Sequence, residues 1–171
     1  MANQTRWRSD SRTAGGPTLR NMMKQLCDIR NVLTRLRVQL RFGRLSRSPL
    51  RLIRLEWRGN HVDCDWIARP PDEWDRNLPK CVGDSNCSLQ ALEDAIAVRS
   101  VLFYTLRDIS TATFRVYRAS ETEPQELIIT GTVTRPEPVR WNIHSLVMRA
   151  KLSGFRFALD DGRLAPIQVE E

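Results

Sequence analysis

The sequence predicts a mixed α+β fold, in which an N-terminal amphipathic helix and a β-hairpin precede a two-layer αββαβ(β) sandwich. Apolar residues recur at helical spacing over 19–40 and 89–103, and alternating apolar and polar stretches flank turn-forming Gly, Asn and Asp residues. The chain has 171 residues, 41% hydrophobic and 27% charged, so we expect a folded core. We divide it into a flexible basic arm (1–17), the amphipathic helix and hairpin (18–69), a Pro- and Asp-rich connection (70–87) and an α+β module (88–171).

The first helix carries the clearest periodic pattern. Its apolar residues are spaced alternately three and four apart, which is an a/d heptad stripe. Thr18 is a suitable N-cap and Gly43 a suitable stop. The stripe either packs on the domain that follows or binds a partner helix or a second copy of the chain. We therefore take as candidate partner-binding residues Leu19, Met22, Leu26, Ile29, Leu33, Leu36 and Leu40.

Charge is distributed unevenly along the chain. Residues 1–58 carry a net charge of +11 and residues 59–171 a net charge of −4. Such asymmetry indicates an acidic partner, which could be a protein surface, nucleic acid or an anionic membrane surface. Arginine suits phosphate and carboxylate, although its excess over lysine also follows from a GC-rich genome. A tryptophan could stack on a base. The candidate residues for these contacts are Arg6, Trp7, Arg8, Arg12, Arg20, Lys24, Arg30, Arg35, Arg37 and Arg41.

Residues 50–69 predict a hairpin that turns at Gly59-Asn60. A two-residue turn pairs Arg58 with His61. The buried face then pairs Trp57 with Val62, Leu55 with Cys64 and Ile53 with Trp66; the other face pairs Glu56 with Asp63 and Arg54 with Asp65.

Two groups of side chains in this region could bind metal. Glu56, Asp63, Asp65 and His61 share one face and could hold a divalent cation, although Arg54 and Arg58 can neutralise these acids on an ordinary solvated strand face. His61 with Cys64, Cys81 and Cys87 could form a mixed site, but Cys81 and Cys87 are five residues apart, wider than in a zinc knuckle. We expect free thiols in a reducing compartment, and neither a resident metal nor a cofactor.

From residue 88 the pattern is regular again. Ser88 is a suitable N-cap for a helix that ends near Asp108. Residues 113–118 and 127–133 predict two strands. A further helix stops at Gly154, and a hairpin turns at Asp160-Asp-Gly.

The stretch Ile129-Thr-Gly-Thr-Val133, followed by a helix and then by Gly154-Phe155 entering a strand, resembles the BON domain over residues 88–160. The resemblance implies an αββαβ module that binds protein partners or lipid surfaces and carries no catalytic residues.

No motif for catalysis is present: the sequence lacks a Gly-rich phosphate loop, a Gly-x-Ser-x-Gly elbow and a His-Glu-x-x-His pair, and it has two histidines, His61 and His144. It also has no apolar run of transmembrane length. We therefore expect a cytoplasmic, non-enzymatic adaptor or assembly subunit that docks through its basic, heptad-striped helix. The alternative is a nucleic-acid-binding protein that uses the Arg-rich N-terminal region.

Overall fold

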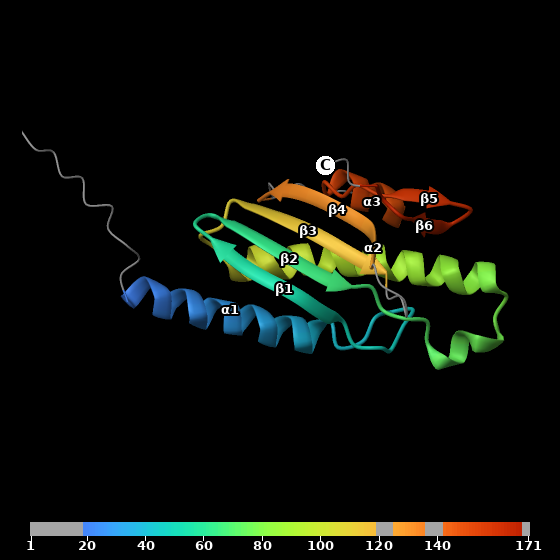
Figure 1. Ribbon diagram of the computed structural model, residues 1–171, viewed down its shortest axis with the longest axis horizontal. Coiled ribbons are helices and arrows are strands. Elements are labelled where there is room, and N and C mark those ends of the chain that lie inside the picture. Colours follow the sequence, from blue (N-terminus) through green and yellow to red (C-terminus); the bar gives the residue numbers. More distant parts are fainter. Residues whose placement is uncertain (1–18, 119–124, 136–141, 169–171) are drawn as a thin grey trace, which may run out of the picture.

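The computed structural model describes residues 19–118, 125–135 and 142–168, and it confirms a mixed α+β fold (Figure 1). The predicted arm 1–17 and the Thr18 cap lie outside the described residues. The helices are α1 (Leu19–Gln39), α2 (Lys80–Thr105) and α3 (Leu146–Leu152), with a 3-10 turn, η1 (Glu73–Asn77). The strands are β1 (Arg51–Arg58), β2 (His61–Ile67), β3 (Thr111–Arg118), β4 (Glu126–Thr134), β5 (Ala158–Asp160) and β6 (Arg163–Ala165).

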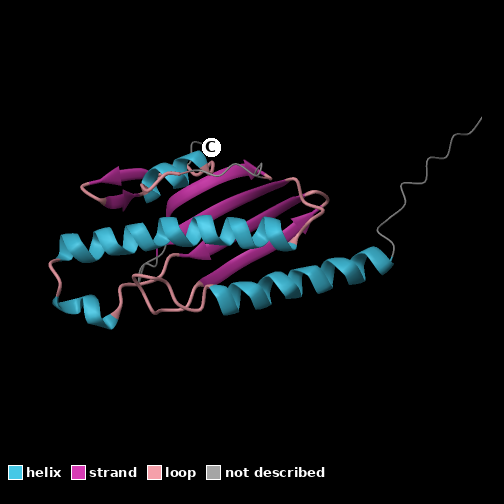
Figure 2. Cartoon of the chain, turned by 180° about the vertical axis from the view of Figure 1, so that it is seen from behind, coloured by secondary structure: helices cyan, strands magenta, loops and turns pink. Residues whose placement is uncertain are grey.

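The four long strands form one sheet in the order β1-β2-β3-β4. β1–β2 and β3–β4 are antiparallel hairpins, and β2 and β3 pair in parallel because α2 carries the chain back across the sheet. The three helices lie on one face of this sheet (Figure 2). Both halves of the sequence thus contribute to one sheet and one core, and the predicted connection at 70–87 does not separate two cores.

The predicted register of the first hairpin is confirmed from its turn to Arg54, which pairs with Asp65. The pairing of Ile53 with Trp66 is wrong. A bulge between Leu52 and Arg54 places Leu52 opposite Trp66, and Ile53 is left 49% exposed.

Helix α2 begins at Lys80, not at Ser88 as the sequence predicted. The Ser88 hydroxyl donates to the Asp84 carbonyl oxygen one turn earlier and accepts a hydrogen bond of 2.9 Å from the amide of Leu164. This serine therefore lies inside the helix and links α2 to β6. Its bond to the carbonyl four residues earlier is one that serine side chains often form within helices.

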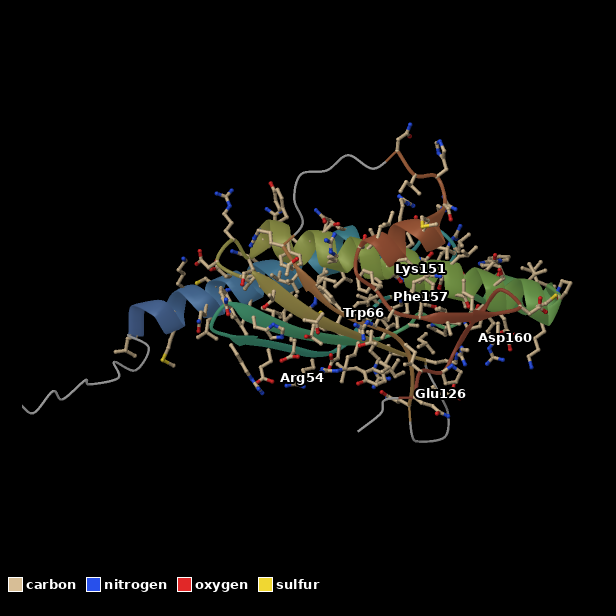
Figure 3. All side chains as sticks on the ribbon, turned by 90° about the horizontal axis from the view of Figure 1, so that it is seen from above. Arg54, Trp66, Glu126, Lys151, Phe157 and Asp160 are labelled. Carbon is tan, nitrogen blue, oxygen red and sulfur yellow. The ribbon has the colours of Figure 1, made fainter. Side chains whose placement is uncertain are left out.

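The core lies between the sheet and the helices. Trp66 meets the ring of Phe114 edge-on at 6.1 Å, and Phe114 packs on Phe155 at 5.6 Å. In Figure 3, Trp66 lies between the two layers, whereas Arg54 lies on the open side of the sheet. The open face is therefore polar and the covered face apolar.

Helix α3 ends at Leu152 with Ser153 as its C-cap, so the predicted stop at Gly154 is the residue directly after the cap. The amide of Phe155 donates to the carbonyl of Ala150, and the amide of Gly154 donates to the carbonyl of Lys151. Gly154 has a φ angle of +91°, which favours glycine. This turn lies directly on β4, because a Cβ on Gly131 would be 2.5 Å from the carbonyl oxygen of Gly154. The glycine of the Ile-Thr-Gly-Thr-Val stretch thus permits a close backbone approach.

Replacing Gly131 with alanine should lower the free energy of unfolding by about 1–3 kcal/mol, because the new methyl group meets backbone that cannot move aside. Chemical denaturation measures the change. Gly83→Ala in α2 is the matched control: nothing lies within 4 Å of its added Cβ, and stability should rise by up to about 1 kcal/mol. Equal stability of Gly131→Ala and the parent chain would contradict the close approach.

A buried arginine fixes the end of α1. Arg69 follows β2, and its Nε donates to Asp94 of α2 at 2.8 Å; the two side chains are 0% and 3% exposed. Its Nη2 donates to the carbonyl of Leu40 at 2.6 Å, and its Nη1 to the carbonyl of Ser48. One guanidinium thereby binds the last turn of α1, the loop before β1, and α2.

Asp94→Asn should cost about 3–5 kcal/mol of stability, because it leaves the Arg69 charge buried without its counter-ion. The neighbouring Glu93→Gln is the control, since Glu93 is 35% exposed and lies 4.0 Å from Arg44. That change should alter stability by no more than about 0.5 kcal/mol. Similar losses in both variants would show that the Arg69 pair has no special role.

Candidate partner-binding surface on helix α1

The heptad stripe of α1 divides into two parts. In the second half of the helix and just beyond it, Leu36 and Leu40 are 5% and 9% exposed, and they pack in the core with the wholly buried Val32. Ile29 and Leu33 are half-buried. This half packs on the chain's own domain, and its buried line is rotated from the predicted stripe toward Val32.

In the first half of α1 the apolar side chains are exposed to solvent. In Figure 1 this end of the helix (blue) extends past the β1–β2 turn. We call its four exposed apolar residues the α1 ridge. They are Leu19 (81% exposed), Met22 (47%), Met23 (63%) and Leu26 (62%). Exposed apolar residues are common singly, but a cluster on one helix face is typical of an interaction site.

The same face of the helix becomes cationic further along. Arg30, Leu33 and Arg37 follow Leu26 at intervals of four, three and four residues, so they continue the line of the ridge. No salt bridge of Arg30 or Arg37 occurs within the described residues. The face thus changes from apolar to positively charged along its length.

A groove of about 830 Å³ lies beside this cationic part, between α1 and the segment Pro49–Leu52 that leads into β1. We call it the α1–β1 groove. Its wall includes Leu33 and Leu50, and three arginines also line it. These arginines are Arg37, Arg41 and Arg51. Such an apolar wall with cationic side chains suits an acidic, amphipathic segment.

Two other basic residues of α1 bind within the domain. Lys24 donates to Asp108 at 2.6 Å; this hydrogen bond raises the pKa of Lys24 and lowers the pKa of Asp108. The guanidinium of Arg35 lies 5.0 Å from the ring centre of Tyr104 on α2. Both contacts hold α1 against its own domain.

The remaining basic candidates are placed as follows. Arg41 lies over the ring of Phe42 at 5.1 Å. Arg20 belongs to the first turn of α1. Arg6, Trp7, Arg8 and Arg12 lie outside the described residues.

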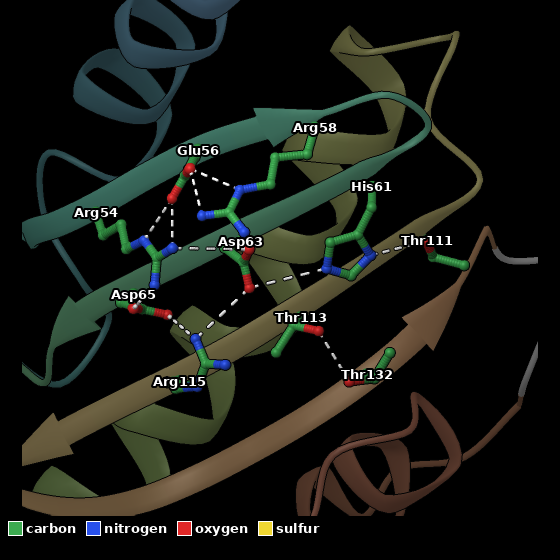
Figure 4. Close-up of polar contacts among 10 residues, drawn as sticks. All are labelled: Arg54, Glu56, Arg58, His61, Asp63, Asp65, Thr111, Thr113, Arg115 and Thr132. Atoms are coloured by element: carbon green, nitrogen blue, oxygen red, sulfur yellow. Dashed lines mark hydrogen bonds and ion pairs between the residues drawn. The ribbon is translucent and has the colours of Figure 1, made fainter.

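The open face of the sheet carries an ion-pair network instead of a cation site (Figure 4). Glu56 accepts hydrogen bonds from both Arg54 and Arg58. Arg115 of β3 lies 3.6 Å from Asp63 and 3.3 Å from Asp65. Arginines therefore neutralise the acids, as one interpretation of the sequence held. Burial raises the pKa of Asp65, although Arg115 opposes the shift.

The mixed histidine–cysteine group is not brought together. Within the described part of the chain, no three His, Cys, Asp or Glu side chains are placed to hold a metal ion. The Nδ1 atom of His61 lies 2.8 Å from the hydroxyl of Thr111, Cys64 is buried under the sheet, and Cys81 is exposed on α2.

Comparison with models of known protein families, with curated proteins and with solved structures finds no match to this chain. The resemblance to the BON domain therefore stays a prediction. Among the residues that the structure describes, no helix combines the length and apolar character needed to span a membrane.

The sequence prediction missed two parts of this surface. Met23 lies outside the a/d positions, yet it follows Leu19 by four residues and shares its face. The pattern over residues 50–69 predicts a hairpin and does not indicate that Pro49–Leu52 lies beside α1. That placement depends on the contacts of Arg69 with the carbonyls of Leu40 and Ser48.

Hydrogen exchange should distinguish the two halves of α1. Backbone amides of residues 23–28 should exchange at least about tenfold faster than those of residues 32–39, because only the second half is packed on the core. Mass spectrometry of peptic fragments measures this difference. Uniform protection along α1 would show that the ridge is already covered in the isolated chain.

Proposed function

We propose that this chain is a non-enzymatic adaptor or assembly subunit that binds an acidic, amphipathic segment of a protein partner along α1. The single observation that carries the proposal is the α1 ridge, whose side chains are 47–81% exposed on a helix that continues into a cationic groove. The partner's apolar side chains would cover the ridge, and its carboxylates would meet the arginines of the groove.

The energetics favour such a partner. Covering a large apolar side chain contributes about 1.5–3 kcal/mol when burial is complete. The ridge therefore supplies part of the free energy that offsets the cost of association, and the arginines of the groove supply more. α1 contains five basic residues and one acidic residue, Asp28. Two α1 helices from separate copies would repel each other, whereas an acidic segment complements the charge and associates faster.

The proposal differs from nucleic-acid binding in its dependence on the ridge. Phosphate binding requires the arginines but not exposed leucine and methionine. Leu26→Ser removes an apolar contact without changing the charge, and Arg37→Gln removes a charge without changing the ridge. The two variants together separate the two classes of partner.

Fluorescence anisotropy should be measured with two probes, a synthetic amphipathic peptide bearing leucines on one face with glutamates beside them, and a DNA duplex. The full chain should bind the peptide, and Leu26→Ser and Arg37→Gln should each weaken binding by about tenfold. The control Thr34→Ser keeps an exposed hydroxyl on α1 and should bind like the parent chain.

Tight DNA binding that Leu26→Ser leaves unchanged, without binding of the peptide, would contradict the proposal and favour a nucleic-acid function. Peptide binding that responds to Arg37→Gln but not to Leu26→Ser would also contradict it, because the ridge would then have no part in recognition. Raising the salt concentration should weaken the contribution of the arginines to peptide binding and leave the contribution of the apolar ridge unchanged.

A further inference from the structure

A separate pocket of about 410 Å³ has Arg69 in its wall but no residue of α1. It is formed where β2 and β3, the two parallel strands, end side by side: Ile67 pairs with Tyr117, and the next residues, Ala68 and Arg118, line the pocket. Ligands of open sheets with crossover helices bind at the carboxyl ends of parallel strands. The pocket's volume also falls within the usual range for small-molecule sites.

The wall combines apolar surface with a few polar groups. Pro70, Pro71, Ile128 and Leu164 contribute apolar surface from the loop after β2, from β4 and from β6. Polar side chains come from the loop after β2, from α2 and from the strands. They are Arg69, Asp84, Cys87, Ser88, Arg118 and Arg163.

Three arginines line the pocket, and two of them are held by contacts within the chain. Arg69 binds Asp94 and the carbonyls of Leu40 and Ser48. Arg118 donates through Nη1 to Glu126 at 2.7 Å and through Nη2 to the carbonyl of Leu164, so it is fixed in place. Arg163 lies 3.8 Å from Asp84, beyond hydrogen-bond distance, and its side chain is 48% exposed. Its planar group of N–H donors therefore remains available for a carboxylate, which it can bind in bidentate fashion.

The other polar groups define the charge of the site. The Ser88 hydroxyl already accepts a hydrogen bond from the amide of Leu164. Burial, and then Asp75 and Asp84, raise the pKa of the Cys87 thiol, so that this side chain is neutral near pH 7. Asp84 is the one acid of the wall among the described residues, and it competes with an anionic ligand for Arg163.

We propose that this pocket binds a small carboxylic acid with an apolar body. The body would lie against Pro70, Pro71 and Ile128, and the carboxylate would bind Arg163 in place of Asp84. This inference is independent of the partner-binding surface on α1, because the pocket and the α1–β1 groove share no lining residue.

Cys87 provides a reporter for occupancy. In a Cys27→Ser, Cys81→Ser chain, the remaining cysteines are Cys87 in the pocket and the wholly buried Cys64. The rate at which iodoacetamide alkylates Cys87 is measured with 4-phenylbutanoate and with its uncharged amide as probes. Calorimetry with the same two probes measures binding without relying on thiol reactivity.

We expect saturable protection of Cys87 by the carboxylate and protection about tenfold weaker by the amide. Arg163→Gln should weaken carboxylate binding by a similar factor, and Asp84→Asn should strengthen it, because the competing acid is removed. Arg149→Gln on α3, outside the pocket, is the control and should bind like the parent. Equal binding of acid and amide, or no binding of either by calorimetry, would overturn the proposal.

Discussion

The buried ion pair between Arg69 and Asp94 is the contact on which the arrangement of this molecule depends. It joins the end of β2 to the middle of α2, and the same guanidinium binds the Leu40 and Ser48 carbonyls at the end of α1 and before β1. Gln90 extends this network: its side-chain amide donates a hydrogen bond to Asp94 and accepts one from the backbone amide of Leu45. Since a buried charge is costly without its partner, these groups hold one another in place.

As a consequence, the two ends of α1 differ in how they pack on the domain. Its last turns are fixed through Arg69 and packed through Val32 and Leu36, whereas its first turns extend beyond the sheet with the α1 ridge uncovered. Lys24 and Arg35 add contacts on the side that faces the domain. The remaining face is both apolar and cationic, which is the reason for proposing an acidic, amphipathic partner instead of a second copy or a phosphate backbone.

Local patterns in the sequence predicted much of the fold and less of the site. The hairpin turn at Gly59, the positive-φ glycine that follows α3 and the α+β class follow from turn chemistry and periodicity. The start of α2 was missed because the Ser88 hydroxyl binds within the helix. The bulge at Ile53 was missed because the alternation of apolar and polar residues continues through it. The heptad stripe predicted an apolar face, but which half is covered depends on Arg69 and Asp94, 25 residues apart in the chain.

Site-specific photo-cross-linking in cells that make the protein would identify what binds the α1 ridge. A benzophenone amino acid replaces Leu26 on the α1 ridge and, as a comparison position away from α1, Trp74 on η1, which is 77% exposed. Mass spectrometry then identifies the cross-linked segment. We expect an acidic, amphipathic protein segment joined at position 26 and not at position 74. Cross-links to nucleic acid, or the same products at both positions, would contradict it.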